Sequence, residues 1–350
     1  MTEQVSPPID ADHPHEVSAI GLIESCKRFC SAQPRRIVFA DAFDERALKA
    51  ASQLSKEGYM FPTLLGDPVQ LRAWAQRHDI DLGAVTLLDP AHAPQLDEYS
   101  KRLQTRLAGK RSALEDARRH HGDSLWFAAM MLKAGDIDCV VAGNLRSTPD
   151  VLRAALRVVG AAPGTKTVSS LFFMIAPNTG QVLAFADCSV VPRPNVAQLA
   201  DIAISTADHY RNVTGNEPRI AMLSFSTMGS LRHSSVTPVR EAVDLIRQRR
   251  PELLVEGELQ FDAAFVPAVA QRKVAGSVLG GRANVFIFPD LNAGNIAYKI
   301  AERLGGYSAL GPMLQGLAKP LHDVSRGCST QDMGEVALVA MKMAFGRCAP

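Results

Sequence analysis

Short apolar stretches alternate with amphipathic helical stretches along the first part of this chain, and this alternation constrains the fold more than any other feature. Strand-like stretches cover residues 36–41 and 62–67. Helical spacing of apolar residues covers 19–30, 45–57 and 69–78. Strands that alternate with helices predict parallel pairing through crossover connections, and therefore a doubly wound α/β sheet.

The later part of the chain continues the pattern with one change. A helix is expected over 124–134, followed by a strand over 139–143 that ends on a glycine. Residues 167–175 and 182–188 predict two paired strands joined by a Pro-Asn-Thr-Gly turn. The remaining expected elements are a helix over 199–210, a strand over 220–224, a helix over 239–249, a strand over 283–288 and a helix over 294–303.

The organisation expected from these stretches is two domains, which a length of 350 residues allows. Residues 1–17 are polar and rich in proline, which predicts a disordered tail. Domain I is expected to be discontinuous, over 18–160 plus 311–350, and domain II to span 161–310. The segment near Arg326 would then lie in a cleft between the domains, a common location for ligands.

Composition excludes several classes of protein. The 38 basic and 36 acidic residues leave a net charge of +2, so neither nucleic acid nor a membrane surface is expected as the main partner. The six cysteines are scattered and no export signal precedes them, which favours reduced thiols in the cytoplasm. Cys26 and Cys30 lie one helical turn apart, but no further cysteine or histidine pair completes a zinc site, so no metal is expected.

Near the C-terminus, four chemically distinct side chains fall within one short segment. Ser325, Arg326, Cys328 and Asp332 supply a hydroxyl, a guanidinium, a thiol and a carboxylate. Ser329 is expected to be the N-cap of the helix that follows, which places Asp332 in the first helical turn. Free N–H groups at a helix start, together with an arginine, predict an anion site.

Two further loops follow expected strands and carry polar side chains. After Gly143 come Asn144, Ser147, Thr148 and, on the next helix, Arg153. A capped helix with a surface arginine and a loop that meets a phosphate are equally compatible with this spacing.

The loop after the 220–224 strand contains Ser226, Thr227 and Gly229. These hydroxyls and the glycine either surround an anion or form a simple turn. Downstream, Glu256, Glu258 and further polar residues alternate, which predicts a strand with an acidic face.

Taken together, these blocks resemble the phosphate acetyltransferase (phosphotransacetylase) family from about Ile20 to Met343. The matching blocks are Gly143 to Arg153, Phe185 to Pro192, Met222 to Ser230, Gly257 to Ala264, Phe288 to Asn295 and Gly311 to Asp332. Gly143-Asn144, Phe185 to Pro192 and Gly305-Gly306-Tyr307 look closest to the ethanolamine-utilisation subgroup.

The resemblance implies reversible transfer of an acetyl group between acetyl phosphate and coenzyme A, with no cofactor besides these substrates. It also implies two α/β/α domains of the isocitrate/isopropylmalate dehydrogenase-like superfamily, an active site between them, and a homodimer. The expected location is the cytoplasm, with packaging in a bacterial microcompartment left open.

The resemblance also suggests the site residues. It puts the catalytic aspartate at Asp332, with Ser325 and Arg326 beside it. The expected substrate-binding residues are Arg153, Arg106, Asn144, Ser147, Thr148, Ser226, Thr227, Gly229 and Cys328. Arg111 is an alternative to Arg106. The family often has lysine at the position of Met228, so a phosphate contact there is not carried over.

The mechanism expected from these residues is direct attack by the coenzyme A thiolate on the acetyl carbonyl. Asp332 would take the thiol proton, Arg326 would bind the departing phosphate, and Ser325 would donate a hydrogen bond to the acyl group or the sulfur. Cys328 is an alternative nucleophile, but no histidine in the segment would activate it. The alternative functions are a phosphate butyryltransferase, a decarboxylating NAD(P)-dependent dehydrogenase, and a catalytically silent domain that senses coenzyme A or acetyl phosphate.

Overall fold

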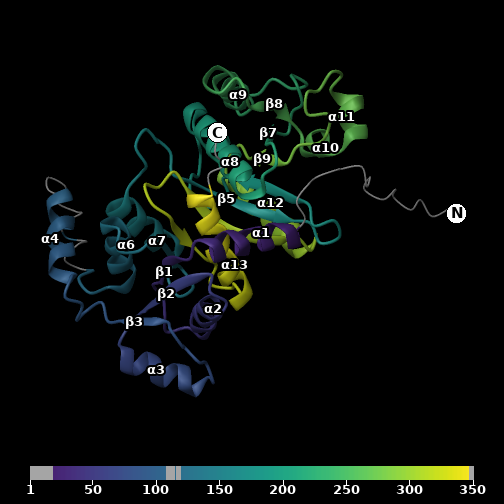
Figure 1. Ribbon diagram of the computed structural model, residues 1–350. Coiled ribbons are helices and arrows are strands. Elements are labelled where there is room, and N and C mark those ends of the chain that lie inside the picture. Colours follow the sequence, from purple (N-terminus) through teal and green to yellow (C-terminus); the bar gives the residue numbers. More distant parts are fainter. Residues whose placement is uncertain (1–18, 108–114, 116–119, 347–350) are drawn as a thin grey trace.

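The computed structural model describes residues 19–107, 115 and 120–346 (Figure 1). The expected N-terminal tail and Arg111 lie outside these residues. The helices are α1 (Ala19–Ala32), α2 (Glu45–Lys56), α3 (Pro68–Arg77), α4 (Leu96–Arg106), α6 (Ser124–Ala134), α7 (Thr148–Ala154), η1 (Ala155–Val159), α8 (Val196–Thr214), α9 (Thr237–Arg249), α10 (Phe261–Phe265), α11 (Pro267–Lys273), α12 (Leu291–Arg303) and α13 (Thr330–Phe345). The strands are β1 (Arg35–Phe39), β2 (Met60–Leu65), β3 (Thr86–Leu88), β4 (Cys139–Ala142), β5 (Ser169–Ile175), β6 (Val182–Ala186), β7 (Arg219–Leu223), β8 (Leu254–Leu259), β9 (Val285–Ile287), β10 (Ser308–Gln315) and β11 (Leu321–Asp323).

The first sheet is parallel and has helices on both faces. Its strand order is β11-β4-β1-β2-β3. Alternate side chains of β1 enter different cores: Ile37 and Phe39 pack with α1, α2 and α13, whereas Val38 packs with α4, α6 and α7. Because both faces are covered, the strands are apolar throughout, as parallel strands in α/β proteins usually are.

The second sheet is mixed, with the order β10-β5-β6-β9-β7-β8. Strands β5 and β6 form the expected antiparallel hairpin, with Leu171 opposite Ala186. Strands β6, β9, β7 and β8 are parallel to one another. One face packs against α8 and α9, and the other against α10 and α12. The α/β class and the presence of two helix-covered sheets are therefore confirmed.

Helix α13 joins the two halves. In Figure 1 it lies near the middle of the molecule, close to α1. Its buried side chains belong to the same continuous core as those of α1, α2 and α8. The C-terminal helix therefore packs against elements that flank both sheets.

The chain returns to the first sheet later than expected. The sequence assigned residues 311–350 to domain I, but β10 pairs antiparallel with β5 of the second sheet as far as Gln315. Only β11 joins the first sheet, next to β4. Residues 311–315 were misassigned because Gly311 and Pro312 interrupt the apolar pattern in the middle of β10, so no strand was expected there.

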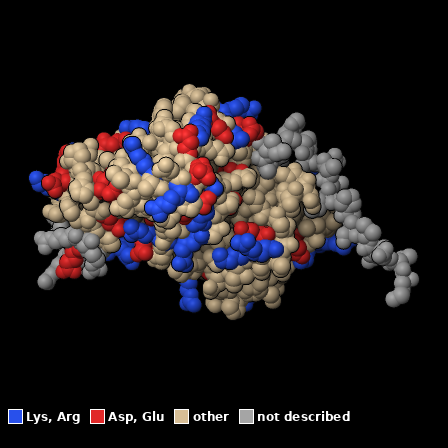
Figure 2. Space-filling model, turned by 90° about the horizontal axis from the view of Figure 1, so that it is seen from below, with Lys and Arg blue, Asp and Glu red and all other residues tan. Residues whose placement is uncertain are grey.

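The surface carries charges of both signs. Figure 2 shows acidic and basic side chains interspersed over one face, with basic side chains gathered near its middle. The near balance of charge in the sequence therefore extends to this face. Among the helices of the described residues, none combines the length and the apolar character needed to cross a membrane.

Candidate active site

Three loops converge at the carboxyl edge of the first sheet. Strands β11, β4 and β1 are neighbours, and the chain leaves them at Asp323, Gly143 and Asp41 respectively. In open α/β sheets, ligands bind beyond the carboxyl ends of the strands. The segment that follows β11 runs from Ser325 to Asp332 and carries the hydroxyl, guanidinium, thiol and carboxylate named in the sequence analysis.

The start of α13 holds Asp332 through a reciprocal cap. Ser329 Oγ accepts a hydrogen bond from the Asp332 amide at 3.1 Å, and Asp332 Oδ2 accepts one from the Ser329 amide at 2.8 Å. The expected N-cap is therefore confirmed. Oδ1 of Asp332 accepts no hydrogen bond from any residue that the structure describes, so this oxygen is available to a ligand.

Ser325 and Arg326 lie at the surface in the loop between β11 and α13. Both are exposed, and Asp332 is partly buried. Ser325 Oγ accepts a hydrogen bond from the Gly327 amide at 3.2 Å, which shapes the turn. Within the described part of the chain the guanidinium of Arg326 makes no hydrogen bond or ion pair, so its five donors can meet an anion.

Arg46 holds this loop in place, although sequence analysis gave it no role. It lies in the first turn of α2, and its Nη1 donates to the backbone oxygens of Arg326 and Cys328 at 2.8 and 2.7 Å. Its Nη2 donates to Asp44 Oδ2 at 2.6 Å and to the Asn144 backbone oxygen at 3.3 Å. One guanidinium therefore ties together the loops that follow β1, β4 and β11.

The charges around Arg46 influence two neighbouring groups. Burial raises the pKa of Asp44, but hydrogen bonds from Arg46 and Asn144 outweigh it and leave the pKa below its usual value. Burial raises the pKa of the Cys328 thiol, and the nearby Arg46 offsets this only in part. Cys328 is therefore a protonated thiol at neutral pH, which makes it a poor nucleophile.

Asn144 and Gly143 are held by carboxylates from the end of β1. The buried Asn144 amide donates to the Asp41 backbone oxygen at 3.0 Å and to Asp44 Oδ2 at 2.9 Å. Asp41 Oδ2 accepts from the Gly143 amide at 2.9 Å. Asn144 thus uses its amide donors to position the loop.

Asp323 is a buried carboxyl directly beneath the same loop. Its Oδ2 accepts a hydrogen bond from Thr148 Oγ1 at 2.6 Å, and its Oδ1 has no partner among the described residues. Burial raises the pKa of Asp323 to about 7; the hydrogen bond from Thr148 opposes this rise and the charge of Asp41 adds to it. Thr148, expected to bind substrate, therefore donates its hydroxyl hydrogen to Asp323 in this structure.

Replacement of Gly143 by alanine is expected to destabilise the protein by about 2–5 kcal/mol, because left-handed backbone strain and steric overlap add together. Gly143 has a φ of +102°, and an added Cβ would lie 1.9 Å from Asp323 Oδ1. Gly58 is the matched control: its φ is +72°, but an added Cβ would meet nothing within 4 Å. Urea unfolding should show a loss of only about 1 kcal/mol for Gly58→Ala. Equal losses in the two variants would contradict the steric argument.

Ser147 and Arg153 belong to a capped helix. Ser147 is the N-cap of α7, with its hydroxyl bonded to Asp150 at 2.6 Å. Arg153 is exposed and pairs with Asp150 at 2.8 Å. The structure thus shows the capped helix with a surface arginine, and a phosphate contact by Arg153 stays a prediction.

Arg106 is not brought together with the segment from Ser325 to Asp332. It ends α4, which lies at the edge of the molecule in Figure 1, whereas α13 lies near the middle. Its guanidinium donates to the backbone oxygens of Val158 and Val159 at the end of η1. In this structure Arg106 stabilises a helix end rather than facing the other candidate residues.

The loop that follows β7 makes its own network in the second sheet. The buried Ser226 donates to Glu258 Oε1 at 2.8 Å, and the Gly229 amide donates to the same oxygen at 2.9 Å. Thr227 exchanges hydrogen bonds with Gln260. Ser226 and Gly229 therefore bind a protein carboxylate, and Thr227 binds a neighbouring amide. Glu258, expected on an acidic strand face, is instead buried and paired with Arg240.

Four functional-site residues were missed because each depends on a distant partner. Asp41, Asp44 and Arg46 follow β1, and Asp323 ends β11. The rule that ligands bind at the carboxyl ends of parallel strands could have identified Asp41 and Asp44, since β1 was expected. The role of Arg46 in holding the loop depends on the backbone oxygens of Arg326 and Cys328, which lie 280 and 282 residues away.

Comparisons with known proteins identify the family of this chain. Residues 21–341 match the family model described as phosphate acetyl/butaryl transferase. A phosphate acetyltransferase of Acetivibrio thermocellus is 41% identical over 324 residues, which cover 91% of this chain and 97% of that relative.

Solved structures give the same result. A structure described as EutD phosphotransacetylase from Staphylococcus aureus is 39% identical, with a TM-score of 0.83, over 93% of this chain and 98% of that one. A phosphotransacetylase from Streptococcus pyogenes is 38% identical, with a TM-score of 0.86, over 92% and 97%. With the family model spanning nearly the whole chain and these relatives sharing its fold, the protein belongs to the phosphate acetyl/butaryl transferase family.

Proposed function

We propose that this protein transfers an acetyl group reversibly between acetyl phosphate and coenzyme A. The relatives named above are described as phosphate acetyltransferase or phosphotransacetylase. Their similarity to this chain covers almost their entire length. The single observation that carries the proposal is the short segment from Ser325 to Asp332. Among the described residues, neither the Arg326 guanidinium nor Asp332 Oδ1 has a hydrogen-bond partner. Arg46 Nη1 holds the segment by donating to the backbone oxygens of Arg326 and Cys328 at 2.8 and 2.7 Å.

The reaction follows from these two groups. Asp332 Oδ1 accepts the proton of the coenzyme A thiol as the sulfur attacks the acetyl carbonyl. The carbon–oxygen bond to the phosphate then breaks, and the phosphate leaves with its negative charge bound by Arg326. Ser325 donates a hydrogen bond to the acyl oxygen. The proton held by Asp332 passes to phosphate or water, so no electron acceptor or other cofactor is required.

A direct assay tests the proposal against its alternatives. Coenzyme A and acetyl phosphate are mixed with the protein, and thioester formation is followed by absorbance. The expected result is rapid thioester formation with acetyl phosphate and slower formation with butyryl phosphate. Faster turnover of butyryl phosphate would indicate a butyryltransferase. Absence of thioester from both substrates would refute the proposal and favour a sensing domain. A separate assay with NAD is the check for a dehydrogenase, which would reduce it.

Replacement of Cys328 by alanine is expected to leave kcat within about threefold of the wild-type value, because transfer is direct and the half-buried thiol is protonated. The backbone oxygen of Cys328, which binds Arg46, remains in the variant. Steady-state kinetics measures the outcome. A folded variant that binds coenzyme A but has lost about 10²-fold or more in kcat would indicate a covalent acetyl-cysteine intermediate instead.

We further propose that the protein forms a homodimer through α12. Ile296, Ile300 and Leu304 recur every four residues and are 57%, 53% and 85% exposed, which makes an apolar stripe on one side of the helix. Lys299 and Glu302 provide charges of both signs near the stripe. Such a surface can pair with its own copy about a twofold axis.

Replacement of Ile300 by aspartate is expected to convert the dimer into a monomer, because two charges would be buried at the symmetry axis. Light scattering after size-exclusion chromatography gives the mass directly. Val69 on α3, 77% exposed, is the matched control, and Val69→Asp should remain dimeric. A monomeric wild-type protein, or a dimer that survives Ile300→Asp, would remove α12 from the interface.

We also propose a cytoplasmic location. The five cysteines that the structure describes are free thiols, the state that a reducing compartment maintains. The resemblance to the ethanolamine-utilisation subgroup leaves a bacterial microcompartment as the alternative. Fractionation of cells that express a tagged chain distinguishes the two.

A further inference from the structure

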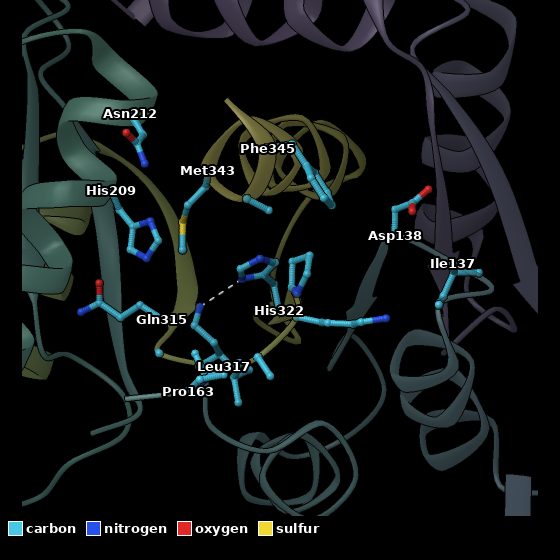
Figure 3. A pocket seen from close by; sticks show the side chains of 18 residues that line it. Ile137, Asp138, Pro163, His209, Asn212, Gln315, Leu317, His322, Met343 and Phe345 are labelled. Carbon is cyan, nitrogen blue, oxygen red and sulfur yellow. Dashed lines mark hydrogen bonds between the residues drawn. The ribbon is translucent and has the colours of Figure 1, made fainter. Parts of the chain in front are cut away.

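A candidate for a second binding site is a cavity of about 610 Å³ between the two sheets (Figure 3). It lies at the amino ends of β4 and β11, where Asp138 and Lys319 line it. Asp332 and Arg326 follow the carboxyl end of β11, so the cavity and the proposed active site occupy opposite edges of the first sheet. Its volume is within the usual range for small-molecule sites.

His322 lines this cavity and carries a buried hydrogen-bond donor. Its side chain is 1% exposed, and its Nδ1 accepts a hydrogen bond from the Leu314 amide at 3.1 Å. A neutral imidazole that accepts at Nδ1 carries its hydrogen at Nε2. That Nε2 is buried and has no partner among the described residues. An unsatisfied buried donor is unfavourable, and a ligand acceptor would satisfy it.

A second imidazole and an amide face the same space from α8. Figure 3 shows His209 and Asn212 on the α8 side of the cavity and His322 near its centre. His209 Nδ1 is also buried without a partner in the part of the chain that the structure describes. Burial lowers the pKa of His209 to about 4 and that of His322 to about 3, so both rings are neutral at physiological pH.

The charges that line the cavity favour an anion. Lys319 contributes an ammonium group whose one hydrogen bond, to the Lys133 backbone oxygen, is long at 3.4 Å. The carboxylate of Asp138 is already neutralised, because Arg36 donates to both of its oxygens at 3.0 and 3.1 Å. His322 Nε2 and the Lys319 ammonium therefore offer two donors to a ligand, one of them charged, while the nearby carboxylate of Asp138 is already paired.

Much of the remaining wall is apolar, and Gln315 adds a polar side chain to it. Pro163, Leu317, Met343 and Phe345 line the cavity. The Arg35 guanidinium lies over the Phe345 ring, 4.0 Å from its centre. A ligand that fits must combine an acceptor group with a compact apolar body.

We propose that this cavity binds a small organic carboxylate, at a site separate from that of the acetyl-transfer substrates. The carboxylate accepts hydrogen bonds from His322 Nε2 and the Lys319 ammonium. The apolar body lies against Met343 and Phe345. His209 and Asn212 on α8 complete the site, so the ligand contacts elements that flank both sheets.

The test uses benzoate as the probe, with the full-length protein and saturating coenzyme A present to occupy the substrate site. Isothermal titration gives affinity, and the ¹⁵N resonances of the histidine rings give location. Benzoate is expected to bind with a millimolar or lower Kd and to shift the His322 Nε2 resonance. Benzamide, which has the same shape without the charge, should bind at least tenfold more weakly.

Two variants keep the test independent of folding. His322→Asn retains an acceptor for the Leu314 amide but removes the donor in the cavity, and Lys319→Met removes the charge from a half-buried side chain. Each should weaken benzoate binding at least tenfold. Lys133→Met removes a neighbouring charge outside the cavity lining and should change the Kd less than threefold. No shift of the His322 resonance at 20 mM benzoate, equal binding of benzamide, or unchanged binding by Lys319→Met would each overturn the proposal.

Discussion

Replacement of Asp332 by asparagine is expected to lower kcat by about 10²–10⁴-fold, the usual contribution of a general base. The reason is chemical rather than structural. The new amide oxygen would still accept a hydrogen bond from the Ser329 amide, now 2.8 Å from Asp332 Oδ2, so α13 should start at the same residue. The KM for coenzyme A should change little, because the lost interaction forms only as the proton moves. Steady-state kinetics and a urea unfolding curve measure both quantities.

The control for this variant separates catalysis from capping. Ser329→Ala removes the hydroxyl that accepts from the Asp332 amide at 3.1 Å. It should destabilise the protein by about 1 kcal/mol while keeping most of the turnover. The two variants thus predict opposite patterns of stability and activity. An Asp332→Asn protein that turns over at the wild-type rate would show that another group takes the thiol proton.

Replacement of Arg46 by methionine is expected to destabilise the protein by about 2–4 kcal/mol and to lower kcat by about 10²-fold. The stability loss arises because Asp44, whose side chain is 8% exposed, would keep its charge without its partner. The loss of turnover arises because the backbone oxygens of Arg326 and Cys328 lose their donor. A displacement of about 1 Å in the loop is enough for such an effect.

A matched ion pair at the other edge of the sheet is the control. Arg36 binds Asp138 through two nitrogens but is 49% exposed. Arg36→Met should therefore destabilise by about 1 kcal/mol or less and leave turnover unchanged. Arg46→Lys keeps the charge but not the planar fork, and should lie between the wild type and Arg46→Met. Wild-type turnover by Arg46→Met would mean that the loop is positioned by other contacts.

Much of the fold could be predicted because its signals are local. Helix α6 has the bounds expected from the sequence, since Asp123 caps its start and Gly135 ends it in a left-handed conformation. The β5–β6 hairpin was likewise visible from its turn residues. The Ser329 cap of α13 depends on side chains three residues apart. In each case the interaction that fixes the element lies within a few positions of it.

The parts that were missed depend on contacts between distant residues. Strands β3 and β11 have three residues each, and neither was expected from the sequence. The tight packing at Gly143 arises only when β11 is placed beside β4. The contact of Arg106 with backbone oxygens of η1 is another that no local pattern indicated, and a substrate contact by Arg106 stays a prediction.

The position of β11 and α13 also bears on how the chain is made. Ribosomes deliver a chain from its N-terminus, and β1 to β4 emerge long before these two last elements. Until they appear, β4 is an unpaired edge and the apolar side of α2, including Leu48 and Ala51, lacks its cover from α13. Unpaired edges and bare apolar surfaces favour aggregation. Premature termination near residue 310 should therefore yield an insoluble nascent product.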